Sequence, residues 1–312
     1  MTGSETARPD SAAADPSAPP TRVACLQLSP AAAELAINRR LAERAIGTAA
    51  RAGAQVIVLP ELMTTGYHLT SAESVALAEP AAGPGVTSWI KALEGHPAVV
   101  VGGFCERGQD GEIYNSAAMV SSDGLLSVYR KTHLWGEEHR LFRPGDEAPP
   151  VVDTRWGRVG MAICYDLFFP EVTRGMALAG AQLLAVPTNS PSTGARSPGS
   201  RAPADGIGHT VARAAAYLNR VYIAVCDRHG DERGHTWTAR SSVIDPEGEF
   251  LAGPVGYEQQ LLLADCDLPE ANRKRWNGTD NNALADRRPE LYGALVAPVG
   301  SAVRPVGEAA AR

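Results

Sequence analysis

The sequence predicts an α/β fold with a mixed sheet, and three observations carry that prediction. Short apolar runs rich in Val and Ile recur along the chain and stop at Gly, Pro or charged residues, as buried strands do. Some of these runs alternate with Ala-rich stretches of helical length, whereas others follow one another closely enough to form hairpins. No domain linker and no internal repeat at a fixed period interrupts this pattern.

The first elements expected are a strand and a helix. Val23 to Leu28 is an apolar run, and Ser29 and Pro30 then suit the N-cap and first position of an Ala- and Arg-rich helix. Gly53 ends that helix, and the β-branched run Gln55 to Leu59 is the next strand. Further strands are expected at residues 98–105, 113–121, 125–130, 158–164, 182–186, 221–226, 240–244 and 260–264. Further helices are expected at residues 86–93, 170–179 and 208–219.

The predicted domain spans residues 21–300, between two loose ends. Residues 1–20 are rich in Ala, Pro and Ser and contain no Val, Ile, Leu, Phe, Tyr or Trp, which predicts a disordered tail. This segment lacks the apolar run of a secretory signal and carries acidic residues, so a cytoplasmic location is expected. Residues 301–312 are expected to form a loose C-terminal tail.

Composition excludes several classes of partner. The 35 acidic and 29 basic residues give a net charge of -6, which lacks the basic footprint of a nucleic-acid binder. No apolar run approaches the roughly 20 residues of a transmembrane helix, so no membrane is expected as a partner. The five cysteines form no CxxC pair and the seven histidines no HExxH motif, so we expect neither a disulfide framework nor a metal or other cofactor.

Three residues whose side chains could take part in catalysis follow predicted strands: Glu61, Lys131 and Cys164. Taken singly, they are more often a turn residue, a surface charge and a core residue. Together they supply what a cysteine nucleophile needs, because a nearby lysine stabilises the thiolate and a glutamate can accept the proton of the thiol. The run Phe168 to Glu171 predicts a helix start soon after Cys164. We therefore expect a sharp strand-to-helix turn that exposes the thiol and points backbone N–H groups toward an incoming oxyanion.

Four segments make the sequence similar to a known family. They are Leu59–Leu62 with Thr65–Tyr67, Tyr129–Leu134, Glu138 with Phe142–Gly145, and Ile163–Asp166 with Phe169–Glu171. In order and spacing they resemble the nitrilase or carbon–nitrogen hydrolase superfamily over residues 22–292. The resemblance implies a four-layer αββα sandwich and subunits that associate as a dimer or larger homo-oligomer.

The resemblance also implies roles for four residues. Glu61 corresponds to the general base, Lys131 to the cation that stabilises the oxyanion, and Cys164 to the nucleophile. Glu138 resembles the second glutamate, which orients the substrate or the lysine. The residues expected to bind substrate are Tyr67, Trp135, Tyr165 and Asn189.

The implied activity is hydrolysis of a small aliphatic amide to a carboxylate and ammonia through a thioester. Cys164-Tyr165-Asp166 resembles the amidase and carbamylase branches, since nitrilases usually carry a Trp-Glu-Asn-like run after the nucleophile. Residues 286–292 are similar to the C-terminal end of 5-aminopentanamidase-like aliphatic amidases, which suggests an ω-amino or ω-guanidino substrate.

The sequence leaves several functions open. A carbamylase acting on N-carbamoyl amino acids needs a cation for the substrate carboxylate, for which Arg196, Arg201 and Arg213 are candidates. A cationic substrate needs a carboxylate, such as Asp205. A nitrilase and a catalytically silent scaffold are also compatible with the sequence. The irregular segment 188–208, and Asp227 in place of the usual asparagine, leave the identity of the substrate open.

Overall fold

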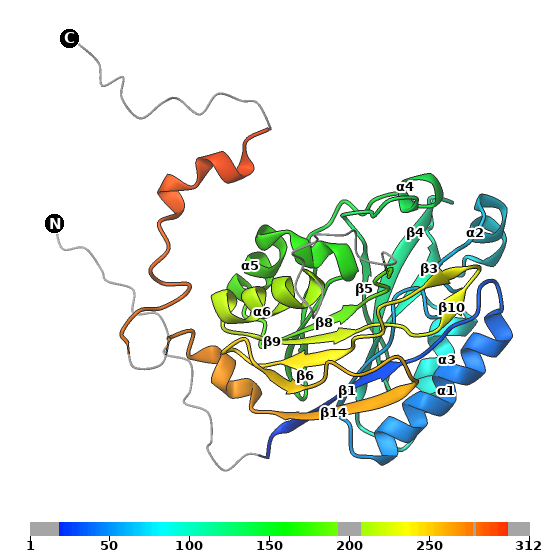
Figure 1. Ribbon diagram of the computed structural model, residues 1–312, viewed down its shortest axis with the longest axis horizontal. Helices are drawn as coiled ribbons and strands as arrows, with labels where there is room; N and C mark the ends of the chain where they lie inside the picture. The colour runs from blue at the N-terminus through cyan, green and yellow to red at the C-terminus, as the bar shows by residue number, and fades with distance from the viewer. Residues whose placement is uncertain (1–18, 193–206, 277–278, 299–312) are drawn as a thin grey trace, which may run out of the picture. The chain divides into compact units, whose positions relative to one another are not determined.

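The computed structural model describes residues 19–192, 207–276 and 279–298 (Figure 1). The described residues divide into two compact units, one up to Arg273 and the other from Lys274 onward. The predicted tails lie outside the described residues, except for residues 19 and 20. In the second unit, the described residues form two short 3-10 helices, η3 (Pro289–Leu291) and η4 (Gly293–Val296).

The first of two large sheets has six strands in the order β14-β1-β2-β3-β4-β5. Strands β1, β2 and β3 are parallel, whereas β14, β4 and β5 join antiparallel to their neighbours. This sheet is mixed, as the sequence predicts. Its strands are β1 (Thr21–Gln27), β2 (Val56–Val58), β3 (Val99–Arg107), β4 (Ile113–Ser121), β5 (Gly124–Arg130) and β14 (Gln260–Cys266).

The second sheet repeats this plan, with the order β13-β12-β9-β8-β7-β6 and a parallel centre formed by β7, β8 and β9. A separate hairpin pairs β10 (Asp231–Glu232) with β11 (His235–Thr236). The strands of the second sheet are β6 (Val151–Thr154), β7 (Gly157–Met161), β8 (Leu183–Pro187), β9 (Tyr222–Cys226), β12 (Ser242–Ile244) and β13 (Phe250–Ala252).

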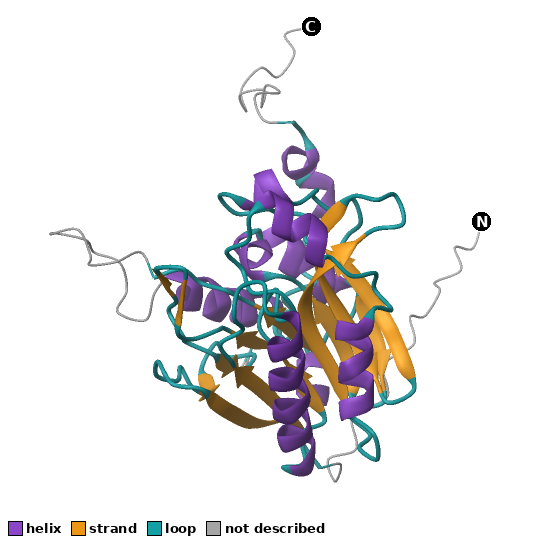
Figure 2. Ribbon diagram, turned by 90° about the vertical axis from the view of Figure 1, so that its right-hand side faces the viewer, coloured by secondary structure: helices purple, strands orange, loops and turns teal. Residues whose placement is uncertain are grey.

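Helices cover the outer faces of both sheets. Helices α1 (Leu35–Arg51) and α3 (Pro84–Ala92) lie side by side on the first sheet (Figure 2). Ile46 of α1 and Trp89 of α3 belong to one apolar cluster with Ile57 of the sheet. Helices α5 (Pro170–Leu178) and α6 (Ile207–Asn219) lie together against the second sheet (Figure 1). The shorter helices are α2 (Ser71–Leu77), α4 (Glu138–Leu141), η1 (Cys164–Phe168) and η2 (Leu268–Asn272).

A continuous apolar core lies between the two sheets. Side chains of the first sheet, such as Val58 and Val101, meet those of the second, such as Met161 and Ala185, and all four are fully buried. In the first sheet, alternate residues of the same strands, such as Ile57 and Val100, point to the helices instead, which is the two-residue period of a strand covered on both faces. The molecule therefore has the four layers αββα that the resemblance implies.

The predicted start of the first helix was wrong. Helix α1 begins at Leu35 and not at Pro30, because two local hydrogen bonds and one to a distant segment hold the preceding residues in a turn. The Asn38 side chain bonds both the N–H and the C=O of Ala31 at 2.7 and 2.8 Å, and the Ala33 N–H donates to Thr65 C=O at 2.8 Å. These bonds tie the turn to the chain that follows Glu61.

Candidate active site

The structure brings the three residues of the predicted triad to one edge of the sheets. Glu61 follows β2, Lys131 follows β5 directly, and Cys164 begins η1 after β7. Strands β2 and β7 belong to the parallel centres of their sheets, and β5 runs in the same direction as β2 because two antiparallel pairings, β3–β4 and β4–β5, precede it. The carboxyl ends of β2 and β5 therefore lie at the same edge, where Cys164 joins them although the three residues lie far apart in sequence. The helix α4, which starts at Glu138, adds a fourth side chain to the same cluster.

Glu61 is a fully buried carboxylate, of which one oxygen accepts hydrogen bonds and the other accepts none. Its Oε1 accepts hydrogen bonds from Lys131 Nζ at 2.7 Å and from Asn115 Nδ2 at 2.8 Å. Its Oε2 is buried and has no hydrogen-bond partner. Burial raises the pKa of Glu61 to about 7 against the opposing effect of Lys131, so near neutral pH this carboxyl can both accept and return a proton.

Glu138 is saturated by donors, in contrast to Glu61. Its Oε1 accepts from Lys131 Nζ at 2.8 Å and from the Tyr67 hydroxyl at 2.6 Å. Its Oε2 accepts from the Trp135 N–H at 3.1 Å. Burial alone would lower the pKa of Lys131, but the attraction of the two glutamates outweighs burial and raises it. Lys131 is therefore a permanent ammonium held between two carboxylates.

Cys164 lies on a strained turn. Its φ of 45° is in the left-handed region, which is uncommon for a residue with a side chain and typical of functional positions. The Sγ lies 3.9 Å from the Asn189 C=O, and the Asn189 side chain donates to Glu61 C=O at 2.8 Å. Burial, then the negative charge of Glu61, raise the pKa of Cys164, whereas Lys131 lowers it. The resting thiol therefore keeps its proton until a base removes it.

Asp166 joins the segments that carry the lysine and the cysteine. This buried carboxylate accepts from the Ile163 N–H at 3.0 Å, next to Cys164. It also accepts from the N–H and the Nδ1 of His133 at 3.1 and 2.8 Å, two residues after Lys131. His133 thus holds the Lys131 segment through hydrogen bonds.

The four residues predicted to bind substrate lie around this cluster in different ways. Trp135 is 46% exposed and meets the ring of Tyr165 edge-on at 4.8 Å, so these two rings form an accessible aromatic wall beside Cys164. Tyr67 and Asn189 direct their side-chain donors at Glu138 and at the Glu61 backbone. Contact of all four with a substrate stays a prediction.

Two residues of the site were missed by sequence reasoning. Asn115 is a polar residue inside the apolar strand β4, and that pattern is the signal that could have found it. Asp166 belongs to the family-like segment after Cys164, but nothing in the sequence indicated that it bonds the His133 segment.

The residues considered for charged substrates lie in different places. Arg213 lies on α6, where it donates to Gly248 C=O and forms an ion pair with Glu249 at 2.9 Å. Its guanidinium is therefore bound by these partners and not by the residues of the site. Asp227 is fully buried and accepts from the Ser190 N–H at 2.9 Å, next to Asn189. Three further candidates lie outside the described residues: Arg196, Arg201 and Asp205.

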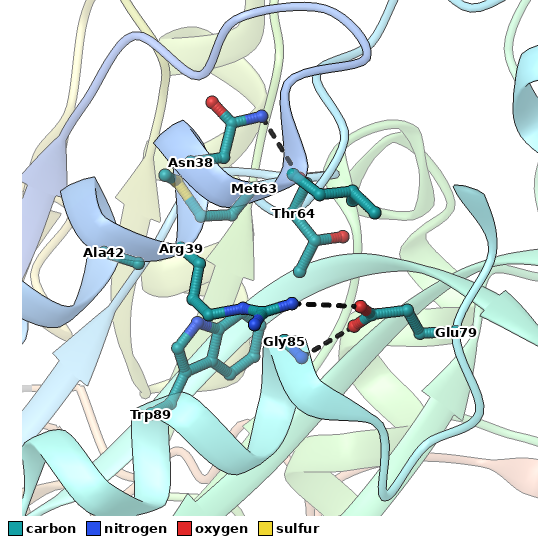
Figure 3. Close-up of a pocket in the computed structure, with 9 residues that line it drawn as sticks. Asn38, Arg39, Ala42, Met63, Thr64, Glu79, Gly85 and Trp89 are labelled. Atoms are coloured by element: carbon teal, nitrogen blue, oxygen red, sulfur yellow. Dashed lines mark hydrogen bonds and ion pairs between the residues drawn. The ribbon is translucent and has the colours of Figure 1, made fainter.

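A small cavity lies behind the turn that follows Glu61 (Figure 3). Asn38 donates to Thr64 C=O at 3.1 Å, and Glu79 accepts from the Gly85 N–H at 2.6 Å. The cavity volume is about 10 Å³, which is room for about one water molecule and not for a substrate. We therefore interpret this region as support for the Glu61 turn.

Comparison with known families identifies the chain. The family model described as carbon-nitrogen hydrolase matches residues 22–275. The chain belongs to the carbon–nitrogen hydrolase family. The match contains Glu61, Lys131, Glu138 and Cys164.

Relatives of this carbon–nitrogen hydrolase carry several names. It is 34% identical to a nitrilase of Pyrococcus abyssi, covering 87% of this chain and 98% of the relative. It is 31% identical to an (R)-stereoselective amidase of a Pseudomonas species, covering 87% and 93%. It is also 31% identical to the N-carbamoylputrescine amidase of Solanum lycopersicum, covering 86% and 92%.

Solved structures agree with the fold and with the enzyme class. A nitrilase-superfamily amidase from Nesterenkonia, crystallised as a cysteine-to-alanine variant, matches with a TM-score of 0.73 at 26% identity, over 90% of this chain and 98% of that one. Another structure of that amidase shows covalent addition of an acetamide group at its active-site cysteine. The predicted four-layer fold and the predicted amidase-type carbon–nitrogen hydrolase are confirmed.

No three His, Cys, Asp or Glu side chains of the described residues gather in an arrangement that could hold a metal ion. None of the described helices has the length and hydropathy that crossing a membrane requires.

Proposed function

We propose that the protein hydrolyses a small primary amide to a carboxylate and ammonia, with Cys164 as nucleophile, Glu61 as general base and acid, and Lys131 as oxyanion donor. The observation that carries this proposal is the unoccupied Oε2 of Glu61, next to a fixed ammonium and a thiol on a strained turn. Glu138, whose oxygens are saturated, serves to hold Lys131.

The first half of the reaction forms a thioester. Glu61 Oε2 takes the proton of the Cys164 thiol while sulfur attacks the amide carbon, and the carbonyl electrons move onto oxygen. Lys131 Nζ and the backbone N–H of Tyr165 donate to this oxyanion. As the oxyanion collapses, the C–N bond breaks, and Glu61 passes its proton to the leaving nitrogen, which departs as ammonia.

The second half releases the acid. A water molecule attacks the thioester carbon and gives its proton to Glu61, and the same donors hold the second oxyanion. When the C–S bond breaks, sulfur recovers a proton from Glu61. The cycle leaves the enzyme unchanged, and a carboxyl whose pKa lies near 7 suits both directions of transfer.

The charges beside the triad favour a neutral acyl group. Among the described residues, Glu61 and Glu138 pair with Lys131, and Asp166 is occupied by His133 and backbone N–H groups. The accessible wall of Trp135 and its aromatic neighbour suits an aliphatic chain. An ω-ammonium or ω-guanidinium substrate would need a carboxylate other than these three.

A second candidate function is hydrolysis of an N-carbamoyl compound. It is supported by the similarity to a relative named N-carbamoylputrescine amidase. The same triad can cleave the C–N bond of a carbamoyl group, whose carbonyl carbon then leaves as carbon dioxide. Because Arg213 forms an ion pair with Glu249, it is not the cation that would bind the carboxylate of an N-carbamoyl amino acid.

Ammonia release from a substrate panel tests both candidates. The panel contains butyramide and other aliphatic amides, 5-aminopentanamide, 4-guanidinobutanamide, N-carbamoyl amino acids and aliphatic nitriles, with Cys164→Ala as the blank. We expect turnover of primary amides and none by the blank. Preference for carbamoyl compounds would select the second candidate, and turnover by the Cys164→Ala variant would contradict both.

Two further properties are proposed on sequence grounds only. We propose that the protein is a homo-oligomer and that it acts in the cytoplasm. Analytical ultracentrifugation of the full chain tests the first, for which a monomer at micromolar concentration would be the contrary result. Fractionation of the native cells tests the second.

A further inference from the structure

The hydroxyl of Tyr67 is committed to the catalytic cluster. It donates to Glu138 Oε1 at 2.6 Å, the oxygen that also accepts from Lys131 Nζ at 2.8 Å. Burial, then the charges of Glu138 and Glu61, raise the pKa of Tyr67 well above 10. The phenol therefore remains protonated and acts as a donor to Glu138.

The backbone that carries Tyr67 is held by a distant carboxylate. The N–H groups of Tyr67 and His68 donate to Glu232 Oε2 at 3.1 and 2.9 Å. Gly66 precedes them with a φ of 75°, and a Cβ at that position would lie 2.4 Å from Glu232 Oε1. Only glycine permits this close approach of the carboxylate to the loop.

Glu232 belongs to a buried ion pair that the proposed mechanism does not use. Arg228 contacts it at 2.9 Å, and the two side chains are 0% and 2% exposed. The guanidinium also donates to Pro30 C=O at 2.7 Å and lies 4.7 Å from the ring centre of Trp237. That indole meets the ring of Tyr67 edge-on at 5.1 Å. Glu232 thus contacts Tyr67 directly, through the backbone N–H of Tyr67. Arg228 supports the Tyr67 ring indirectly, through the indole of Trp237.

A buried ion pair adds little net stability, because desolvation offsets the attraction of its charges. The hydrogen bonds of Glu232 to the Tyr67 loop, and the contact of Arg228 with Trp237, indicate a different role for the pair. We propose that Tyr67 is a positioning residue, whose hydroxyl fixes Glu138 and Lys131 for the reaction, and that the Arg228–Glu232 pair holds Tyr67 in place.

The physical reason is competition for Lys131. The Tyr67 hydroxyl and Lys131 share Glu138 Oε1, so the hydroxyl satisfies part of the charge on that oxygen. Without the hydroxyl, Glu138 attracts the ammonium more strongly, and Lys131 moves away from Glu61 and from the oxyanion. This inference rests on the proposed function, in which Lys131 stabilises that oxyanion.

The test compares Tyr67→Phe with a matched control, Tyr222→Phe. The hydroxyl of Tyr222 also donates from a buried ring to a glutamate, Glu270 at 3.2 Å, but it lies at the start of β9, the strand end opposite the site. For Tyr67→Phe we expect kcat to fall about 10- to 100-fold with KM unchanged, the size of one hydrogen bond to a charged group. The control should leave kcat and KM unchanged.

A second readout does not depend on turnover. Lys131 lowers the pKa of the Cys164 thiol, so a displaced ammonium slows alkylation of that thiol by iodoacetamide. Peptide mass spectrometry follows the modification of Cys164 alone. The alkylation rate should fall in Tyr67→Phe and stay unchanged in Tyr222→Phe.

Glu232→Gln extends the test to the ion pair. This variant keeps the shape of the side chain and removes its charge, and we expect the same fall in kcat and in alkylation rate. If it does not fold by circular dichroism, Tyr67→Phe decides the question alone.

Three results have distinct meanings. A raised KM with unchanged kcat in Tyr67→Phe would show that Tyr67 binds substrate and would overturn the inference. Unchanged kinetics and alkylation would also overturn it. If the wild-type protein hydrolyses no compound of the panel, the proposed function fails, and the alkylation rates still decide whether Tyr67 positions Lys131.

Discussion

Replacing Asn115 by Leu removes one of the two donors to Glu61 Oε1 and keeps the number and branching of the side-chain heavy atoms. The lost hydrogen bond, at 2.8 Å, stabilises the ionised carboxylate and lowers its pKa. A hydrogen bond to a charged group contributes about 1.5–3 kcal/mol, and one pKa unit corresponds to about 1.4 kcal/mol. Because Lys131 still donates to the same oxygen, we take the lower end and expect the pKa of Glu61 to rise by about one unit.

The sign of this shift fixes the expected pH profile. Glu61 accepts a proton only when ionised, so the acid limb of kcat/KM moves from near pH 7 to near pH 8. At pH 7 the ionised fraction falls from about half to about a tenth, which lowers kcat/KM about fivefold. At pH 9 the variant should approach the wild type.

The assay is ammonia release from a primary amide between pH 5.5 and 9.5. The matched control is Asn219→Leu, which makes the same change at a buried asparagine of α6 that bonds Thr173 and Ala215. This control should leave the acid limb unmoved. An acid limb that stays in place or moves down in Asn115→Leu would refute the role of Glu61 as the titrating base.

Three other substitutions have expected outcomes. Lys131→Met leaves Glu61 and Glu138 buried without a cation, so turnover should cease and the free energy of unfolding, from urea denaturation, should fall by about 3–5 kcal/mol. Gly103→Ala places a Cβ 2.5 Å from the Glu61 Cα, so we expect a lower kcat and a loss of about 1–3 kcal/mol in the same denaturation measurement. Asp227→Asn should raise Tm at pH 8 but not at pH 4. Burial raises the pKa of Asp227 from 3.8 to about 6, so ionisation destabilises the folded state as pH rises through that window, by about 3 kcal/mol at most. An unchanged Tm at pH 8 would contradict this.

Local patterns in the sequence were sufficient for the mixed sheet and for the three candidate residues, whereas the four layers and the catalytic roles came from the family resemblance. Apolar runs predict strands that are buried on both faces, and the carboxyl ends of parallel strands share an edge. Glu61, Lys131 and Cys164 each follow such a run, and all three converge in the structure. Helix starts with local signals were also predictable, such as Pro170 at the first position of α5.

Features that depend on long-range contacts were not predictable. The start of α1 was wrong because Asn38 and Thr65 hold the preceding turn, and neither bond has a signal in the Ser29–Pro30 pattern. Glu232 is 165 positions from the loop that it holds. A periodic pattern reports which face of an element is buried, but it does not report which polar groups meet across the fold.

The central claim is that an acyl group is transferred to Cys164. Mixing the enzyme with a primary amide substrate, quenching in acid within the first turnovers and mapping peptides by mass spectrometry tests this claim directly. We predict a mass gain equal to the acyl group on the peptide that contains Cys164, which hydroxylamine removes as a hydroxamate. Continued turnover with no acyl group on that peptide, or with the acyl group on another residue, would contradict the proposed mechanism.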